Sequence, residues 1–218
     1  MSAPAIPAGH VPRAGDLVGT VHAPGRGTGG PAPKRIVVGF GFWLFILSDI
    51  VMFSAFFASY VVLQARTGDG PTPHGLFNLQ NTAWETALLL VSSFTCGLAS
   101  MAVERRNLIW TQVTLLVTGL LGAAFIVLEI REFSSLVAQG ATATRSAFLS
   151  AFFTLVGCHG VHVSLGLIWL GTTMAQFVAK GFRQDIRHRY YCFSLFWHAL
   201  DIIWVGIFTI VYLGANLS

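Results

Sequence analysis

Two histidines three residues apart, His159 and His162, lie inside an apolar run that extends from Phe148 to Leu170. The run is long enough to cross a bilayer, since a membrane span needs about 20 apolar residues. An ionisable group inside a span is costly, so it usually has a partner or a function. These histidines could bind a metal or, together with His198, a haem.

The positions of the histidines along their spans argue against a shared haem, which would require two ligands at one depth. Counted from the Lys- and Arg-rich ends of straight helices, His162 would lie roughly 24 Å deep and His198 roughly 12 Å deep. Three histidines are also too few for a di-iron site, and no Glu-x-x-His pair is present. We therefore predict no catalytic, cofactor or metal site here, and expect all three histidines to hydrogen-bond within the bundle or to a lipid headgroup.

Carboxylates inside the spans are the second group of candidates. Asp49 and Asp201 would both lie roughly 16 Å from the same membrane surface. They could share a proton, bind a cation or accept hydrogen bonds from a neighbouring helix, and the last interpretation is favoured because such bonds are common at helix contacts. Asp201 also lies three residues after His198, so we expect the two to pair directly on one helix face. A proton relay is the functional alternative for this pair.

Glu85, Glu129 and Glu132 lie near the ends of their spans. They could face lipid headgroups or a neighbouring helix, or they could be buried in a cleft, and the sequence does not distinguish these possibilities.

The elements that carry these residues are five apolar spans. Of 218 residues, 54% are hydrophobic and only 10% are charged, which indicates a polytopic membrane protein. Residues 1–35 are predicted to form a flexible, Gly- and Pro-rich cytoplasmic tail. Residues 36–214 are predicted to form an all-α bundle of five transmembrane helices, at about 36–63, 84–103, 108–130, 147–179 and 190–213. Small residues three or four apart indicate close helix contacts, as in Ser54/Ala58, Ser93/Gly97, Gly119/Gly122 and Gly160/Ser164.

The distribution of Lys and Arg predicts the orientation of the chain. Ten of the 13 Lys and Arg residues lie in the N-terminal tail and in the second and fourth links, and three lie on the opposite side. Cytoplasmic segments carry the excess of positive charge, so we predict a cytoplasmic N-terminus and a periplasmic C-terminus. The net charge of +4 is thus a topology signal, and no nucleic-acid partner is expected.

Several motifs on different spans, in order, resemble subunit III of haem-copper terminal oxidases. They are Gly41-Phe42-Trp43 with Ser48-Asp49, Glu85-Thr86 before Ser92-Ser93, Glu129 with Glu132-Phe133, Gly157-x-His159-Gly160-x-His162-Val163, and Ser194-Leu195-Phe196-Trp197-His198 with Asp201 and Trp204. The resemblance covers roughly residues 36–214. The five-span form is most similar to that of cytochrome bo-type ubiquinol oxidases, whereas the cytochrome c oxidase form commonly has seven spans.

The resemblance implies a non-catalytic subunit of a proton-pumping quinol:oxygen oxidoreductase in the bacterial inner membrane. It implies that haem and copper lie in subunit I, the main contact, with subunit II and a possible subunit IV as further partners. It also implies bound phospholipids and a role in assembly and sustained proton uptake. Under this reading seven residues are structural, lipid-binding or proton-support candidates: Asp49, Glu85, Glu129, His159, His162, His198 and Asp201.

Two alternatives remain open at the level of sequence. The chain could be subunit III of a cytochrome c oxidase, because five-span versions occur there as well. It could also be a stand-alone small transporter or an assembly factor, for which Asp49 and Asp201 would have to line a solvated path.

Overall fold

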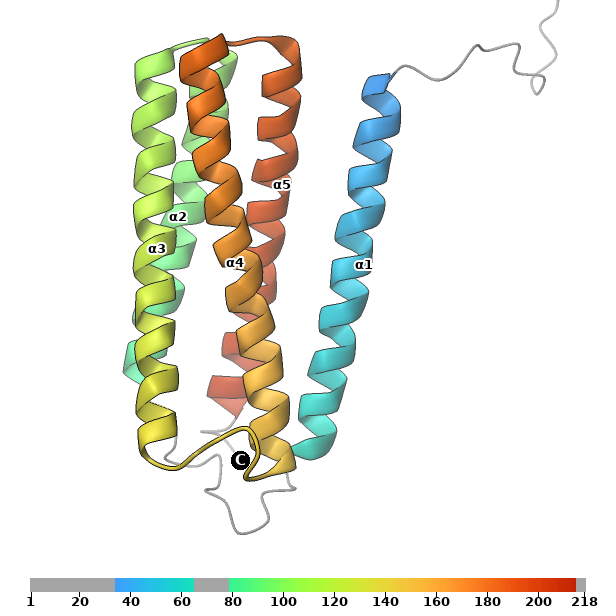
Figure 1. Ribbon diagram of the computed structural model, residues 1–218, viewed down its shortest axis with the longest axis vertical. Helices are drawn as coiled ribbons and strands as arrows, with labels where there is room; N and C mark the ends of the chain where they lie inside the picture. The colour runs from blue at the N-terminus through green and yellow to red at the C-terminus, as the bar shows by residue number, and fades with distance from the viewer. Residues whose placement is uncertain (1–33, 65–78, 215–218) are drawn as a thin grey trace, which may run out of the picture. The chain divides into compact units, whose positions relative to one another are not determined.

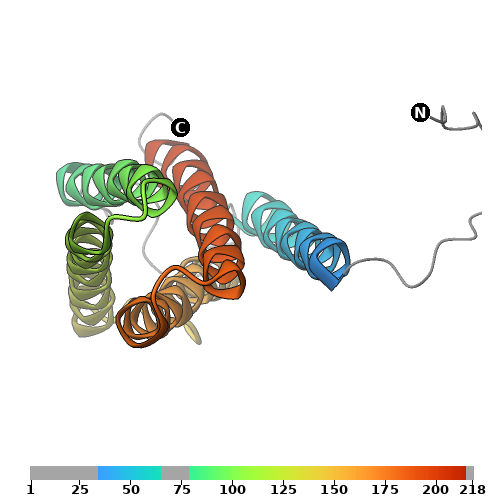
Figure 2. The same ribbon diagram turned by 90° about the horizontal axis from the view of Figure 1, so that it is seen from above.

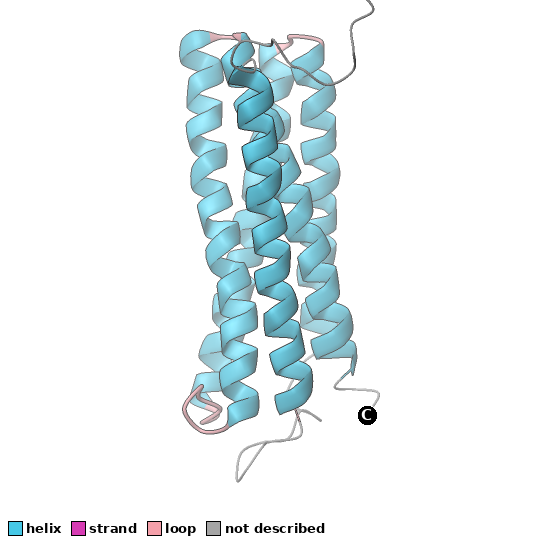
Figure 3. Cartoon of the chain, turned by 90° about the vertical axis from the view of Figure 1, so that its right-hand side faces the viewer, coloured by secondary structure: helices cyan, strands magenta, loops and turns pink. Residues whose placement is uncertain are grey.

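The computed structural model describes residues 34–64 and 79–214, and the described residues are helical apart from short links (Figures 1 and 3). The helices are α1 Lys34–Leu63, α2 Leu79–Glu104, α3 Leu108–Ala138, α4 Ala147–Lys180 and α5 Gln184–Ile207, followed by a π-helical segment, η1, at Phe208–Leu213. Five helices in this part of the chain are long and apolar enough to cross a membrane, which confirms the predicted number. The predicted orientation of the termini stays a prediction.

The chain divides into two units, residues 1–37 and 38–218. Of the first unit, only the opening turn of α1 is described, so the predicted flexible tail lies almost entirely outside the described residues.

Helix boundaries follow local chemistry. The side chain of Asn107 accepts a hydrogen bond from the backbone N–H of Trp110 and begins α3, and Ser146 does the same for Leu149 at the start of α4. α4 ends before Gly181, whose φ of +66° suits glycine. Because only a short turn joins α2 to α3, the two helices are antiparallel neighbours (Figure 1).

α2, α3, α4 and α5 surround a common core, and residues 38–63 of α1 lie beside α4 and α5 (Figure 2). Side-chain hydroxyl groups of α2 accept hydrogen bonds from the indole N–H groups of α5 across this core. Trp197 Nε1 donates to Ser92 Oγ, and Trp204 Nε1 donates to Thr86 Oγ1, each at 3.1 Å. These bonds satisfy the polar edges of two large buried rings and fix the rotation of α5 against α2.

α1 packs on the rest of the unit through aromatic side chains. Phe53 and Tyr60 are each 1% exposed, and Phe42 meets Trp169 of α4 edge to face, with 5.8 Å between ring centroids. Phe57 packs against Gly206 of α5. The outward face of α1 is apolar and exposed, as expected of a helix that meets lipid or another subunit.

Candidate functional site

Three glutamates from two helices lie together near the end of the bundle where α2 begins. Glu85 comes from α2, and Glu129 and Glu132 come from α3, where they are three residues apart. Glu85 is 1% exposed and Glu129 is 4% exposed. Glu129 lies close enough to the other two for their charges to interact. We call these three residues the carboxylate cluster.

The carboxylate cluster contains buried acceptors that lack donors. Oε2 of Glu85 and Oε2 of Glu129 have no hydrogen-bond partner in the described part of the chain. Such groups are costly in hydrocarbon, so an arrangement of this kind points to a bound molecule or proton. The buried Tyr212, carried by η1, lies near all three glutamates. π-Helical turns often occur at functional sites, and here the turn brings a phenol close to the carboxylates.

Glu129 also packs directly on α4. A Cβ atom at Gly160 would lie 3.1 Å from Glu129 Oε1, so the glycine leaves room for this carboxylate. A groove of about 300 Å³ between α3 and α4 opens beside it, with Phe133 and Leu165 among its apolar lining residues. The sequence predicts that a neighbouring helix comes close at Gly160. In the structure, the group that lies against Gly160 is the carboxylate of Glu129.

His159 is fully buried among aromatic rings. Its ring stacks on that of Trp204 with 5.2 Å between centroids, and it meets the rings of Phe125 and Phe53 edge to face. Neither ring nitrogen has a hydrogen-bond partner among the described residues. The prediction that all three histidines hydrogen-bond is therefore wrong for His159, which packs α4 against α1, α3 and α5.

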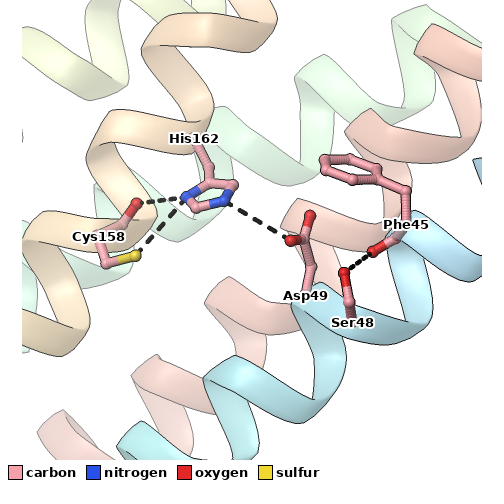
Figure 4. A network of polar contacts seen from close by, with 5 residues as sticks. All are labelled: Phe45, Ser48, Asp49, Cys158 and His162. Carbon is pink, nitrogen blue, oxygen red and sulfur yellow. Dashed lines mark hydrogen bonds and ion pairs between the residues drawn. The ribbon is translucent and has the colours of Figure 1, made fainter.

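His162 points towards α1 and contacts Asp49 (Figure 4). Its Nδ1 donates to the backbone carbonyl of Cys158 at 2.8 Å, and its Nε2 lies 4.0 Å from Asp49 Oδ1. This distance is too long for a hydrogen bond, and the contact is an ion pair only when His162 is protonated. Ser48, next to Asp49, donates a hydrogen bond to the backbone carbonyl of Phe45 in its own helix. Its hydroxyl group therefore does not compete with His162 for Asp49.

His198 finds its partner on α2 and not on its own helix. Ser93 Oγ lies 2.6 Å from His198 Nδ1, and Asp201, 9% exposed, has one oxygen without a hydrogen-bond partner in the described residues. In the described part of the chain, the histidine and carboxylate that lie within 4.0 Å of each other are His162 and Asp49. The expected direct contact of His198 with Asp201 is not formed, but the charges of the two residues interact and Ser93 of α2 bonds to both of them. Asp49 and Asp201 have different neighbours, which disfavours a shared proton.

The difference in depth between His162 and His198 is smaller than predicted. α5 begins at Gln184 and not near Tyr190, so His198 lies further from the start of its helix than expected. The ring of Phe196 lies 6.4 Å from that of His162, which places the two helices at a similar level there. What separates the two histidines is direction, because His162 faces α1 and His198 faces α2.

The donor groups thus form three separate sets and not one centre. In the described ranges, no group of three His, Cys, Asp or Glu residues is placed to hold a metal ion. The absence of a metal from this chain stays a prediction. The sequence marks Ser93 as a small residue at a close helix contact but not as the partner of a histidine, and it gives Tyr212 no role, because a tyrosine near the end of a span carries no distinctive spacing signal. Glu132 was recognisable from its three-residue spacing to Glu129.

The sequence is similar to a known family over most of its length. Residues 30–216 match the family model described as cytochrome c oxidase subunit III.

Individual relatives carry two kinds of name. The cytochrome bo(3) ubiquinol oxidase subunit 3 of Pseudomonas aeruginosa is 50% identical over 178 residues, which cover 82% of this chain and 85% of the relative. The quinol oxidase subunit 3 of Bacillus subtilis is 44% identical and covers 79% of this chain and 85% of the relative. The cytochrome c oxidase subunit 3 of Bacillus sp. strain PS3 is 42% identical and covers 79% of this chain and 84% of the relative.

Proposed function

Because the chain belongs to the cytochrome c oxidase subunit III family, we propose that it serves as the accessory subunit III of a haem-copper terminal oxidase that oxidises ubiquinol. The observation that carries the choice of donor is the 50% identity, over 82% of this chain, to a subunit named for ubiquinol oxidation. The relative named for cytochrome c oxidation is 42% identical.

The arrangement of polar groups supports an accessory role within a respiratory membrane complex. The histidines face three different neighbours, so they do not converge on one cofactor. In the proposed complex, haem and copper belong to subunit I, which would also be the main contact of this chain, with subunit II and a possible subunit IV nearby. The chain would contribute to assembly, hold phospholipids and support proton uptake by subunit I in a bacterial inner membrane.

A stand-alone transporter fits the structure less well. It would need Asp49 and Asp201 on one solvated path. Asp49 instead contacts His162 between α1 and α4, whereas Asp201 lies near the contact of α5 with α2. The two carboxylates therefore have no common lining in the described part of the chain.

Purification of the tagged full-length chain from its native membrane in mild detergent tests this proposal. We expect larger subunits, haem and copper to co-purify, and we expect the preparation to consume oxygen with a reduced quinol. Reduced cytochrome c, supplied to the same preparation, serves as the matched substrate control. Oxygen consumption with cytochrome c alone would reject the quinol assignment, and a single chain without haem would reject the oxidase assignment.

A further inference from the structure

A cavity of about 560 Å³ opens at the end of the bundle where α2 begins and α3 approaches its end. Its polar lining includes Asn81, Trp84, Glu85, Arg131, Glu132 and Gln139. The cavity is therefore distinct from the contact of α1 with α4 and from the groove beside Gly160. Its volume lies within the range of about 300–1,000 Å³ that is common for sites that bind small molecules.

Glu85 lines this cavity and is itself almost fully buried. The residue is 1% exposed, and its Oε2 has no hydrogen-bond partner among the described residues. A second carboxylate, Glu132, lines the same cavity, and the charges of Glu85 and Glu132 interact. Two neighbouring carboxylates with a free acceptor favour a ligand that carries positive charge and N–H donors.

Arg131 and Trp84 give the cavity a different chemistry at its exposed side. Arg131 is exposed and supplies a guanidinium group, which binds phosphate well. Trp84 is 64% exposed near the start of its span, where tryptophans lie at the level of lipid headgroups. The cavity therefore offers carboxylates to a cation and a guanidinium to an anion, beside a surface that faces lipid.

We propose that this cavity binds the headgroup of an aminophospholipid of the phosphatidylethanolamine type. Its primary ammonium group donates to Glu85 and Glu132, and its phosphate accepts from Arg131. A choline headgroup has no N–H to donate, and a glycerol headgroup has no positive charge. A metal ion fits less well, because no three metal-ligating side chains in the described ranges are placed to hold one.

This inference rests on the proposed function only in placing the chain in a bilayer, and it does not depend on the electron donor. It assigns a specific headgroup and specific residues to what would otherwise be general lipid contact. The ammonium group of the lipid also supplies a hydrogen-bond donor to the unpaired oxygen of Glu85. Without a donor, burial of this oxygen costs free energy that no contact offsets.

Native mass spectrometry of the purified complex tests the assignment. The complex is stripped of lipid with detergent and then titrated with an equimolar mixture of phosphatidylethanolamine, phosphatidylcholine and phosphatidylglycerol, and lipid adducts on this chain are counted. We expect phosphatidylethanolamine to bind at least about tenfold more tightly than the other two, since only its ammonium group can make charge-assisted hydrogen bonds to the two carboxylates.

Three variants separate the contributions of the cavity residues. Glu85→Gln should remove most of the preference for phosphatidylethanolamine, because it removes the charge that the ammonium meets. Arg131→Gln should weaken the binding of all three lipids, because each of them carries the phosphate. Glu104→Gln is the matched control, since Glu104 is an exposed glutamate at the other end of the same helix, and it should change nothing.

Two results would overturn the inference. One is equal binding of the three lipids by the unaltered complex, or a preference that survives Glu85→Gln. The other is a map of the complex in which a basic side chain of a neighbouring subunit occupies the cavity. Retention of haem and of the other subunits, measured in the same samples, tests the proposed function separately, so the failure of one leaves the other standing.

Discussion

At the scale of single residues, two contacts between polar side chains inside the spans join different helices. His198 of α5 meets Ser93 of α2, and Asp49 of α1 meets His162 of α4. Such contacts add to the van der Waals packing and lipid exclusion that hold membrane helices together. They are therefore expected to affect retention of the chain in its complex before they affect the chemistry of the complex.

Replacement of Ser93 by Ala tests this expectation. The change removes the 2.6 Å contact with His198 Nδ1 and leaves a ring nitrogen of the half-buried His198 without that partner. We expect a loss of about 1–3 kcal/mol of stability. The measurement is the temperature at which this chain dissociates from the detergent-purified complex, which should fall.

Ser48→Ala is the control for this variant, because the hydroxyl of Ser48 bonds only within its own helix. It should leave the dissociation temperature almost unchanged. Oxygen consumption per haem should be the same in both variants. If Ser93→Ala abolished oxygen consumption in a complex that kept every subunit, the contact would belong to a proton path and not to helix packing.

The sequence identifies which polar residues matter better than it identifies their partners. All seven candidate residues lie inside the spans, and Glu85 and Glu129 do meet in one cluster. Spacing along one helix predicted a His198–Asp201 pair, but partners across helices depend on tilt and rotation, which a single sequence does not encode. The depths estimated for straight helices, roughly 24 Å for His162 and roughly 16 Å for Asp49, accordingly did not predict that these two side chains meet.

At the scale of helices, Trp197 joins three neighbours of α5. A Cβ atom at Gly122 of α3 would lie 2.8 Å from its Cη2 atom, and one at Gly166 of α4 would lie 3.0 Å from its Cζ3 atom. The indole N–H of Trp197 is held by Ser92 of α2. The Trp197 ring therefore has little freedom to move, and it fills the space that Gly122 and Gly166 leave because they have no side chains.

Gly122→Ala should destabilise the bundle in spite of the better helix propensity of alanine. The added methyl group would overlap a ring that is fixed by its hydrogen bond, and overpacking of this kind costs about 1–3 kcal/mol. Gly97→Ala is the matched control, because nothing lies within 4 Å of a Cβ atom there. It should be neutral or stabilising by up to about 1 kcal/mol.

Thermal unfolding of the purified variants, followed by loss of tryptophan fluorescence, compares the two substitutions. Equal midpoints for Gly122→Ala and Gly97→Ala would show that the Trp197 ring can move aside. The small-residue spacing of Gly119 and Gly122 predicted a close contact at this place, but not that an aromatic ring would fill it.

Helix ends were less predictable from the sequence than the spans themselves. α5 begins at Gln184 and α3 continues to Ala138, both beyond the predicted boundaries. Apolar content marks where a helix crosses the hydrocarbon, whereas the helix itself extends further into the polar headgroup region. The charged residues before Tyr190 are thus helical without being apolar. Because the predicted span left them out, the depth estimated for His198 was too small.

At the scale of the whole molecule, orientation in the membrane decides what each candidate site can meet. The cavity next to Glu85 lies at the end of α2 that begins with Leu79, and the link between α2 and α3 lies at the opposite end. Because ten of 13 Lys and Arg residues are predicted to lie on one side, the charge rule predicts that this link is cytoplasmic and that the cavity lies towards the periplasmic leaflet.

Reporter fusions test this orientation. A phosphatase that is active only outside the cytoplasm, fused after Ser218, should be active, and a green fluorescent protein at the same place should not fluoresce when exported unfolded. The same two reporters fused after Arg106, in a chain truncated there, should give the opposite result, because this link is predicted to be cytoplasmic. Phosphatase activity after Arg106 and fluorescence after Ser218 would invert the topology, and the cavity would then meet the lipids of the cytoplasmic leaflet.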